Sequence, residues 1–214
     1  ERDNVRLWAR ADAPGRYEIE LLGAGSPRVA ASDEASEADD LTLHWTIADL
    51  RGRAFAGYVV RRDGVEVARD EVFAVRGAVG DDAPRAVLAF GSCANERRDA
   101  EQNVWLAIAA RHPDALLLLG DTPYIDSKKL DGHRKRHREF FGSDEIAACL
   151  RAVPTYFVWD DHDYTGDGKF GSGKGRDEAR RAFLEYRANA SFGSGDAGVY
   201  HSFRRGPIEG FALD

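Results

Sequence analysis

Three short apolar runs each end in residues that can bind a metal ion. Cys93 follows the first run, Asp121 follows the second, and Asp161 follows the third. Because the site of an open α/β sheet lies beyond the carboxyl ends of its strands, we expect these three side chains to converge. A thiolate and two carboxylates in one place would be suited to metal-assisted chemistry.

The third of these positions is the most acidic. Residues 160–167 contain four aspartates and one histidine. Like charges at the end of a buried strand repel each other, and isolated buried charges are costly. A bound cation would remove that cost. The alternative is a solvated acidic loop, and the residues at the other two run ends favour the metal site.

Two further side chains allow different interpretations. Cys93 is either a small packed residue or a soft ligand suited to iron or zinc. Tyr124 is either a packed aromatic or a phenolate ligand, with Asp121 placed to bridge two ions. A cysteine phosphatase loop would need an arginine six positions after the cysteine, where Asp99 stands instead, so a nucleophilic role for Cys93 is set aside.

Two motifs nearly match other functions. Residues 168–174 resemble a P-loop, but Gly175 stands where a serine or threonine should hold magnesium. We therefore prefer a flexible active-site loop and keep nucleotide binding as an alternative. Residues 161–166 resemble the start of an EF-hand, but Ser172 stands where the loop needs glutamate. We reject the EF-hand.

Other candidate residues are interpreted as structural. His133 and His137 are four residues apart on a helix rich in arginine and lysine, which indicates a surface or phosphate-facing helix rather than a zinc site. His201 is expected in a strand as a structural residue. Cys149 is expected to be a buried helical thiol.

The N-terminal part of the chain, residues 1–80, is expected to be all-β. Apolar side chains alternate with polar ones over 5–10, 17–21 and 41–47, which is typical of half-buried strands. An Asp63-Gly64 pair between two such runs predicts a hairpin. Short strands at this spacing indicate a β-sandwich with Trp45 in its core. The acidic stretch 32–40 is expected to be a solvated loop.

After a linker over 77–84 the pattern changes to alternating strands and helices. Strands are expected near 86–90, 115–119 and 155–159. Helices are expected near 99–111, starting with a capping box, near 132–150 with a break close to Gly142, and near 177–190. This order predicts a buried, largely parallel sheet.

The bulk properties limit the function classes. The 214 residues suffice for two small domains, and the net charge of −7 argues against a nucleic-acid partner. No apolar run reaches the roughly 18 residues that span a membrane. Two cysteines exclude a disulfide-rich scaffold. The chain begins at Glu1 and contains no methionine, so we expect the true start, with any export signal, to lie upstream.

Several ordered motifs resemble the alkaline phosphatase D (PhoD-like) family. They are FGSC (90–93), LLLLGDTPY (116–124), VPTYFVWDDHD (153–163), FLEYRANASFG (183–193) and VYHSFRRGPIEGFALD (199–214). The resemblance implies an α/β/β/α metallophosphoesterase core over 85–214. Residues 1–80 resemble the fibronectin-III-like domain that precedes the catalytic domain in this family and in purple acid phosphatases.

The resemblance also implies a ligand set and cofactors. Cys93 and Tyr124 would bind Fe(III), and Asp121 would bridge to a divalent ion, with Ca(II) expected first and Zn, Mn or Mg as alternatives. Asp161 stands where related enzymes place an asparagine ligand, and Asp160 is a further candidate ligand. His162 matches the catalytic histidine of that motif.

The implied activity is hydrolysis of small phosphomonoesters or phosphodiesters by a metal-bound hydroxide, in an exported protein. The family needs further aspartate and histidine ligands from a C-terminal half. We therefore expect a fragment that is incomplete at its C-terminus and inactive alone, or else a natural short form. Two alternatives remain: a P-loop-like nucleotide-binding protein, and a non-catalytic calcium-dependent binding module. The oligomeric state stays open.

Overall fold

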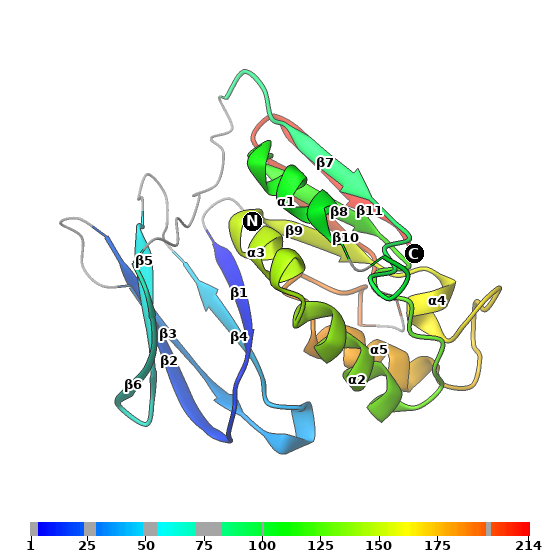
Figure 1. Ribbon diagram of the computed structural model, residues 1–214, viewed down its shortest axis with the longest axis horizontal. Coiled ribbons are helices and arrows are strands. Elements are labelled where there is room, and N and C mark those ends of the chain that lie inside the picture. Colours follow the sequence, from blue (N-terminus) through cyan, green and yellow to red (C-terminus); the bar gives the residue numbers. More distant parts are fainter. Residues whose placement is uncertain (1–3, 24–28, 49–54, 72–82, 100, 196–197) are drawn as a thin grey trace. The chain divides into compact units, whose positions relative to one another are not determined.

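The computed structural model describes residues 4–23, 29–48, 55–71, 83–99, 101–195 and 198–214. The chain divides into two compact units, residues 1–81 and 82–214, and each is described by itself (Figure 1). Within the described ranges, none of the helices has both the length and the apolar character needed to cross a membrane.

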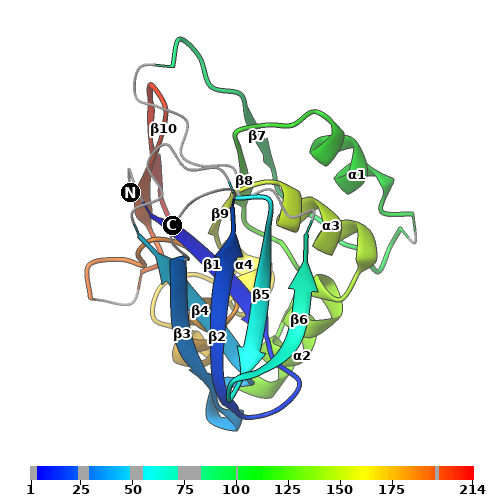
Figure 2. The same ribbon diagram turned by 90° about the vertical axis from the view of Figure 1, so that its left-hand side faces the viewer.

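The N-terminal unit consists of antiparallel strands in two sheets (Figure 2). One sheet has the order β3-β2-β5-β6 and the other pairs β1 with β4. The strands are β1 (Val5–Arg10), β2 (Gly15–Leu22), β3 (Val29–Ala35), β4 (Thr42–Ile47), β5 (Gly57–Arg62) and β6 (Val65–Asp70). Strands of both sheets contribute to one apolar core, which agrees with the expected packing of two sheets.

This core is built from the alternating side chains. Tyr17, Ile19 and Leu21 of β2 are buried, and Trp45 of β4 is only 3% exposed. The Trp45 indole N–H donates to the carbonyl oxygen of Tyr17 at 3.4 Å, which satisfies its one polar group. Each such buried side chain contributes about 1.5–3 kcal/mol relative to an exposed one. The burial of Trp45 was predicted and is confirmed.

The hairpin prediction is confirmed, and the acidic-loop prediction is wrong. Asp63 and Gly64 join β5 to β6 with φ values of 49° and 83°, the positive values that a tight hairpin turn needs. The stretch 32–40 instead contains most of β3, which pairs with β2, and a 3-10 helix, η1 (Glu37–Asp39). Ala31 and Ala35 of β3 pack on the core, but the adjacent Asp33 and Glu34 lie between them in the sequence, so the apolar pattern of the strand is weak.

The C-terminal unit contains the predicted parallel sheet. Its order is β7-β8-β9, with β7 (Leu88–Gly91), β8 (Ala115–Leu119) and β9 (Thr155–Val158). The helices are α1 (Asn103–Ala110), α2 (Leu130–Phe141), α3 (Asp144–Ala152), α4 (Asp161–Tyr164) and α5 (Arg176–Glu185). A hairpin of β10 (His201–Arg205) and β11 (Ile208–Ala212) completes the unit.

One face of the sheet packs against helices, and the other is covered in part, since Phe90 of β7 remains 76% exposed. Leu116 and Leu118 of β8 belong to a core that also contains residues of α1, α2, α3 and α5. Tyr156 of β9 stacks on Phe203 of β10, with ring centroids 4.2 Å apart.

The helix predictions are confirmed in part. The break near Gly142 separates α2 from α3, and Cys149 is fully buried as expected. The expected capping box is wrong, because α1 starts later, at Asn103, with no side-chain cap. The carboxylate of Asp99 instead accepts a hydrogen bond from the Glu101 N–H at 3.0 Å, a local turn that competes with the helix.

The surface position expected for His133 and His137 is also wrong. Both side chains are buried, at 0% and 1% exposure. His137 stacks on Tyr186 with ring centroids 4.8 Å apart, so this face of α2 is turned toward the interior. Burial lowers the pKa of both rings. His201 lies buried in β10, as expected.

Candidate metal centre

The loops after β7, β8 and β9 bring Cys93, Asp121 and His162 together. The Cys93 N–H donates to the Gly120 carbonyl oxygen at 3.2 Å, which joins the ends of β7 and β8. The Cys93 Sγ lies 3.6 Å from one carboxylate oxygen of Asp121, and the His162 N–H donates to the other at 3.2 Å. Asp121 is 7% exposed and lies between the two other loops.

The backbone at this junction is held in an uncommon conformation. Cys93 and Asp121 have φ values of 59° and 53°, in the left-handed region that non-glycine residues seldom adopt. Such positions cost about 1–3 kcal/mol and cluster at functional sites. Gly120 has a φ of 100°, and a Cβ there would lie 2.5 Å from the Cβ of Asp160. Only glycine allows the ends of β8 and β9 to approach this closely.

Asp121, Asp161 and His162 form a group that could hold a metal ion. Each offers one ligand atom, and the three atoms lie within 4.8 Å of one another. The pKa of Asp161 is lowered, chiefly by a hydrogen bond from the Gly168 N–H, so this carboxylate stays negatively charged. Two carboxylate oxygens and an imidazole nitrogen suit several divalent and trivalent metals. The donor set therefore fits the expected metal.

His162 is oriented by a residue that the sequence analysis missed. Its Nδ1 lies 2.7 Å from a carboxylate oxygen of Asp126. Burial opposes protonation of the ring, but this hydrogen bond and the nearby aspartates outweigh it and raise the pKa of His162. Asp126 follows Asp121 in the same loop and has a φ of 53°. Its acidic side chain two residues after Tyr124 was the only signal in the sequence.

Tyr124 lies beside Cys93, Asp121 and His162. Its ring centroid is 4.4 Å from that of His162. Burial raises the pKa of the phenol to about 12, with further contributions from its hydrogen bonds to Cys93 and Asp121. A cation at the same place would act in the opposite direction and favour the phenolate. The structure thus places Cys93, Asp121, Tyr124 and His162 together.

Asp160 has a different local role. Its carboxylate caps α4 by accepting the Asp161 N–H at 2.9 Å, and the Asp163 carboxylate reciprocates by accepting the Asp160 N–H. This capping box fixes the direction of the helix turn that carries Asp161 and His162. Its role as a metal ligand stays a prediction.

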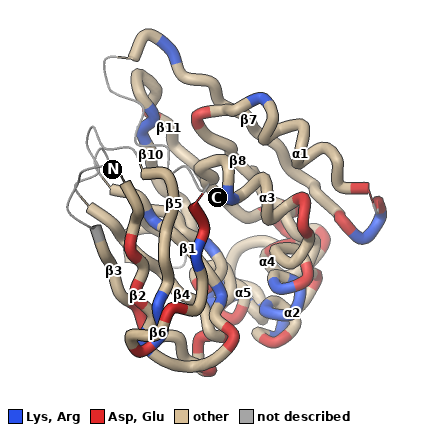
Figure 3. Tube along the Cα trace, turned by 60° about the vertical axis from the view of Figure 1, so that its left-hand side comes forward, with Lys and Arg blue, Asp and Glu red and all other residues tan. Residues whose placement is uncertain are grey.

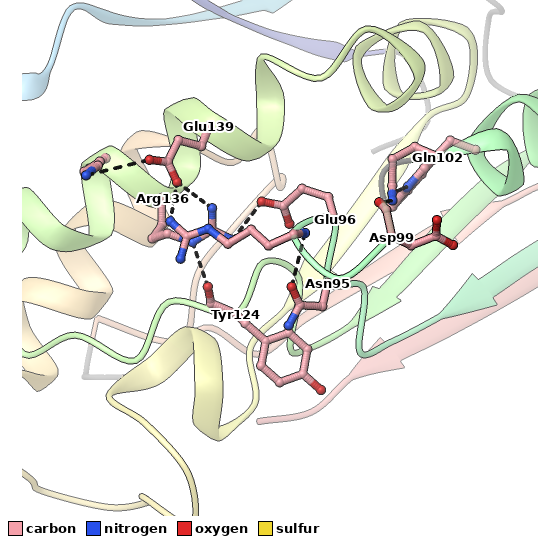
Figure 4. A network of polar contacts seen from close by, with 10 residues as sticks. Asn95, Glu96, Asp99, Gln102, Tyr124, Arg136 and Glu139 are labelled. Carbon is pink, nitrogen blue, oxygen red and sulfur yellow. Dashed lines mark hydrogen bonds and ion pairs between the residues drawn. The ribbon is translucent and has the colours of Figure 1, made fainter.

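A buried arginine on α2 joins two of the three loops (Figure 4). The Arg136 Nε donates to the carbonyl oxygen of Tyr124 at 2.8 Å, and Nη1 donates to Glu139 at 2.7 Å. Its Nη2 forms an ion pair with Glu96 at 2.8 Å, in the loop that follows Cys93. The basic run on α2, where Lys and Arg are blue in Figure 3, was interpreted as a surface, so this contact was not predicted.

A second buried arginine supports the loop after β8. Arg187 is 1% exposed and donates to the Thr122 carbonyl oxygen at 3.0 Å. Its guanidinium lies 4.5 Å from the centroid of the Phe157 ring. Burial lowers the pKa of Arg187, and the charge of buried Asp163 opposes this. Burial raises the pKa of Asp163 in turn.

A pocket of about 490 Å³ opens beside His162. Its lining comes from the loops after β7 and β8 and from the start of α4. The lining residues are Asn95, Arg97, Arg98, Tyr124, Ile125, Asp126 and His162. The candidate catalytic histidine therefore faces a space that a small substrate can enter.

Comparison with solved structures gives two extensive matches. The structure of PhoD matches with a TM-score of 0.77 and 18% sequence identity, over 96% of this chain and 48% of that chain. The purple acid phosphatase PPD1 from yellow lupin (Lupinus luteus) seeds matches with a TM-score of 0.68 and 11% identity, over 100% of this chain and 43% of that chain. The chain thus spans about half the length of the structures that it resembles.

No family model matches the sequence, and no curated protein matches it. The likeness is therefore visible in the fold and not in overall sequence identity. Both solved structures agree with the fold expected from the motifs over 85–214. The fibronectin-III-like identity of the N-terminal unit stays a prediction.

Proposed function

We propose that this chain, which has a PhoD-like metallophosphoesterase fold, belongs to a metal-dependent hydrolase of phosphomonoesters or phosphodiesters. One observation carries the proposal: Asp121, Asp161 and His162 gather within 4.8 Å at the carboxyl ends of parallel strands. This is the edge at which open α/β sheets bind their ligands. The pocket beside His162 would take the substrate.

The ligand assignment rests on the types and positions of the donors. Asp121 and Asp161 would supply carboxylates, and Asp121 would bridge two ions because it lies between the other loops. Cys93 and Tyr124 favour Fe(III) as one of the ions, with Ca(II), Zn, Mn or Mg as the other. When bound, such ions supply Lewis acidity toward the phosphoryl oxygens and a more acidic water molecule.

The residues of the chain would perform the proton transfer and the positioning. His162 lines the pocket, and its bond to Asp126 holds the ring in one orientation. From there it would donate a proton to the leaving oxygen of the ester. Arg136 and Arg187 would keep the loops that carry Tyr124 and Asp121 in place. From the resemblance of its sequence motifs to an exported family, we propose that the protein is exported.

The two other functions have less support. The P-loop-like stretch 168–174 follows α4 instead of a strand, and its Gly168 N–H is bound to Asp161. The calcium-module hypothesis relied on a β-sandwich together with an acidic loop at 32–40, and in place of that loop the structure has β3 and η1. Both observations favour the hydrolase.

Hydrolysis of 4-nitrophenyl phosphate and bis(4-nitrophenyl) phosphate tests the proposal. In the whole hydrolase to which we propose this chain belongs, we expect activity after loading with iron and a divalent metal, its loss on chelation, and a loss of about 10²-fold or more in His162→Asn. His112→Asn, at an exposed histidine, is the matched control and should keep full activity. Activity that survives chelation, or equal activity in both variants, would contradict the proposal.

A further inference from the structure

We propose that the pocket beside His162 binds a second anionic group of the substrate and that Arg98 determines this specificity. The inference rests on the proposed function and names its substrate class. The preferred substrates are phosphate esters whose alcohol portion carries a carboxylate or another phosphate.

The pocket has two walls of different origin. Asn95, Arg97 and Arg98 come from the loop after β7, whereas Asp126 and His162 come from the loop after β8 and the start of α4. Its volume of about 490 Å³ is within the range of pockets for small organic ligands. An ester whose leaving oxygen faces His162 would extend its alcohol portion into this space.

The charges in the pocket are unevenly compensated. The Asp126 carboxylate is paired with His162, and the Arg97 guanidinium is paired with Glu139 at 2.5 Å. Within the described chain, the side chain of Arg98 has no hydrogen bond or ion pair. The protein has a net charge of −7, yet this wall presents an uncompensated cation beside an acidic centre. An anionic group of the ligand would supply the missing partner.

The wall that carries Arg98 is held in place. Glu96 pairs with buried Arg136, and Glu139 accepts hydrogen bonds from both Arg136 and Arg97 (Figure 4). The Arg98 N–H donates to the Asn95 carbonyl oxygen at 3.1 Å, which closes a turn. A fixed loop lowers the ordering cost of binding. The planar guanidinium of Arg98 can then bind a carboxylate or a phosphate with two parallel hydrogen bonds.

A matched pair of esters isolates the second anion. 4-Carboxyphenyl phosphate and 4-carbamoylphenyl phosphate have the same shape and similar leaving groups, but only the first carries a second charge. We expect the metal-loaded protein to prefer the carboxylate by about tenfold in kcat/KM, mainly through a lower KM, because a charge-assisted hydrogen bond is stronger than one between neutral groups. 1,4-Phenylene bisphosphate distinguishes a phosphate preference from a carboxylate preference.

Substitution of Arg98 gives the decisive comparison. In Arg98→Ala the preference should fall to about one, because kcat/KM should fall much more for the carboxylate ester than for the amide ester. Arg98→Lys should retain part of the preference, since it keeps the charge and loses the planar fork. Arg111→Ala, at an exposed arginine outside the pocket, is the matched control. An unchanged preference in Arg98→Ala, or equal losses on both esters, would overturn the proposal.

Failure of the proposed function is distinguishable from failure of this inference. If neither ester is hydrolysed, the hydrolase assignment fails, but binding of the two esters can still be measured by calorimetry. The subsite then requires the carboxylate ester to bind at least about threefold more tightly, with the difference lost in Arg98→Ala. Equal binding of the two esters would refute the subsite.

Discussion

The two units of the molecule differ in what they bury. Among the described residues, Glu20 and Thr42 are the buried polar side chains of the N-terminal unit. The C-terminal unit buries many more: Gln102, Asp121, Thr122, His133, Arg136, His137, Asp163, Thr165, Glu185, Arg187, Asn189 and His201. The buried side-chain atoms without a hydrogen-bond partner in the described chain also all lie in the C-terminal unit.

The core of the N-terminal unit is mainly apolar, whereas the core of the C-terminal unit also contains polar side chains that bind and position loops. Apolar burial stabilises a unit without fixing any particular atom. Buried arginines such as Arg136 and Arg187 cost desolvation energy, yet they bind the loop carbonyl oxygens of Tyr124 and Thr122. We infer that burial of these arginines lowers the stability of the C-terminal unit and keeps its loops in place, a trade-off common at functional sites.

The largest expected effect is on the centre itself. Asp121→Asn removes a charge at the point where the three loops meet, and we expect activity to fall by about 10³-fold or more, since even residues that support a metal ligand contribute 10–100-fold. Metal content per chain should fall in parallel while the melting temperature changes little. Full metal occupancy in this variant would remove Asp121 from the ligand set.

The comparison of the two cores is tested by one substitution in each. Arg187→Met should cost about 3–5 kcal/mol in the free energy of unfolding, because it leaves Asp163 as an uncompensated buried charge. Leu43→Ala, in the N-terminal core, should cost about 2–5 kcal/mol through its cavity. Denaturant unfolding gives both values.

The activities of these two variants should differ more than their stabilities. Under conditions where both variants are folded, Arg187→Met should be impaired, because Arg187 binds the Thr122 carbonyl beside Asp121. Leu43→Ala should be fully active. Equal activity in the two variants would contradict the idea that the C-terminal core, unlike the N-terminal core, positions the site.

A smaller effect is expected at the phenol. Tyr124→Phe keeps the ring against His162 and removes only the hydroxyl, so we expect about a tenfold loss of activity. The iron-loaded wild type should absorb visible light through Tyr124 or Cys93, and this band should shift in the variant. Tyr58→Phe, in the N-terminal unit, is the control. An unchanged spectrum would make Tyr124 a packed aromatic.

The smallest effect compares two ion pairs. Hydrogen bonds from Arg136 and Arg97 lower the pKa of Glu139 below its ordinary value of 4.5. Its stabilisation is therefore present above that value and is lost as the pH falls through the lowered pKa. Glu139→Gln should weaken the pH dependence of the free energy of unfolding below about pH 4.5. We expect the change to be less than about 1 kcal/mol, because the pair is screened by solvent.

The matched variant for this prediction is Glu66→Gln. Glu66 pairs with Arg69 on the surface of the N-terminal unit, and its pKa is also lowered by that hydrogen bond. Because this pair is exposed and screened by solvent, we expect no measurable change in acid unfolding. Equal changes at Glu66 and Glu139 would show that the pair at Glu139 has no special role.

The sequence predicts the strands that carry the site better than it predicts the side chains that hold the site's loops in place. Apolar runs such as Ala115–Leu119 identify the parallel strands, and their ends identify Asp121. Arg136 and His137 could not be placed, because charged and polar residues on a basic helix indicate a surface until their partners are known. Asp126 was missed for a similar reason: its contact with His162 joins residues 36 positions apart.

The central claim is that Asp121 and Asp161, with His162 beside them, hold a metal ion that the reaction needs. Anomalous diffraction from crystals grown with iron and with manganese tests it most directly, because it places the metal without reference to activity. We predict an anomalous peak about 2.0–2.3 Å from Asp121 and Asp161, with His162 beside it. A well-occupied metal elsewhere in the protein, with density for water alone between Asp121 and Asp161, would contradict the account.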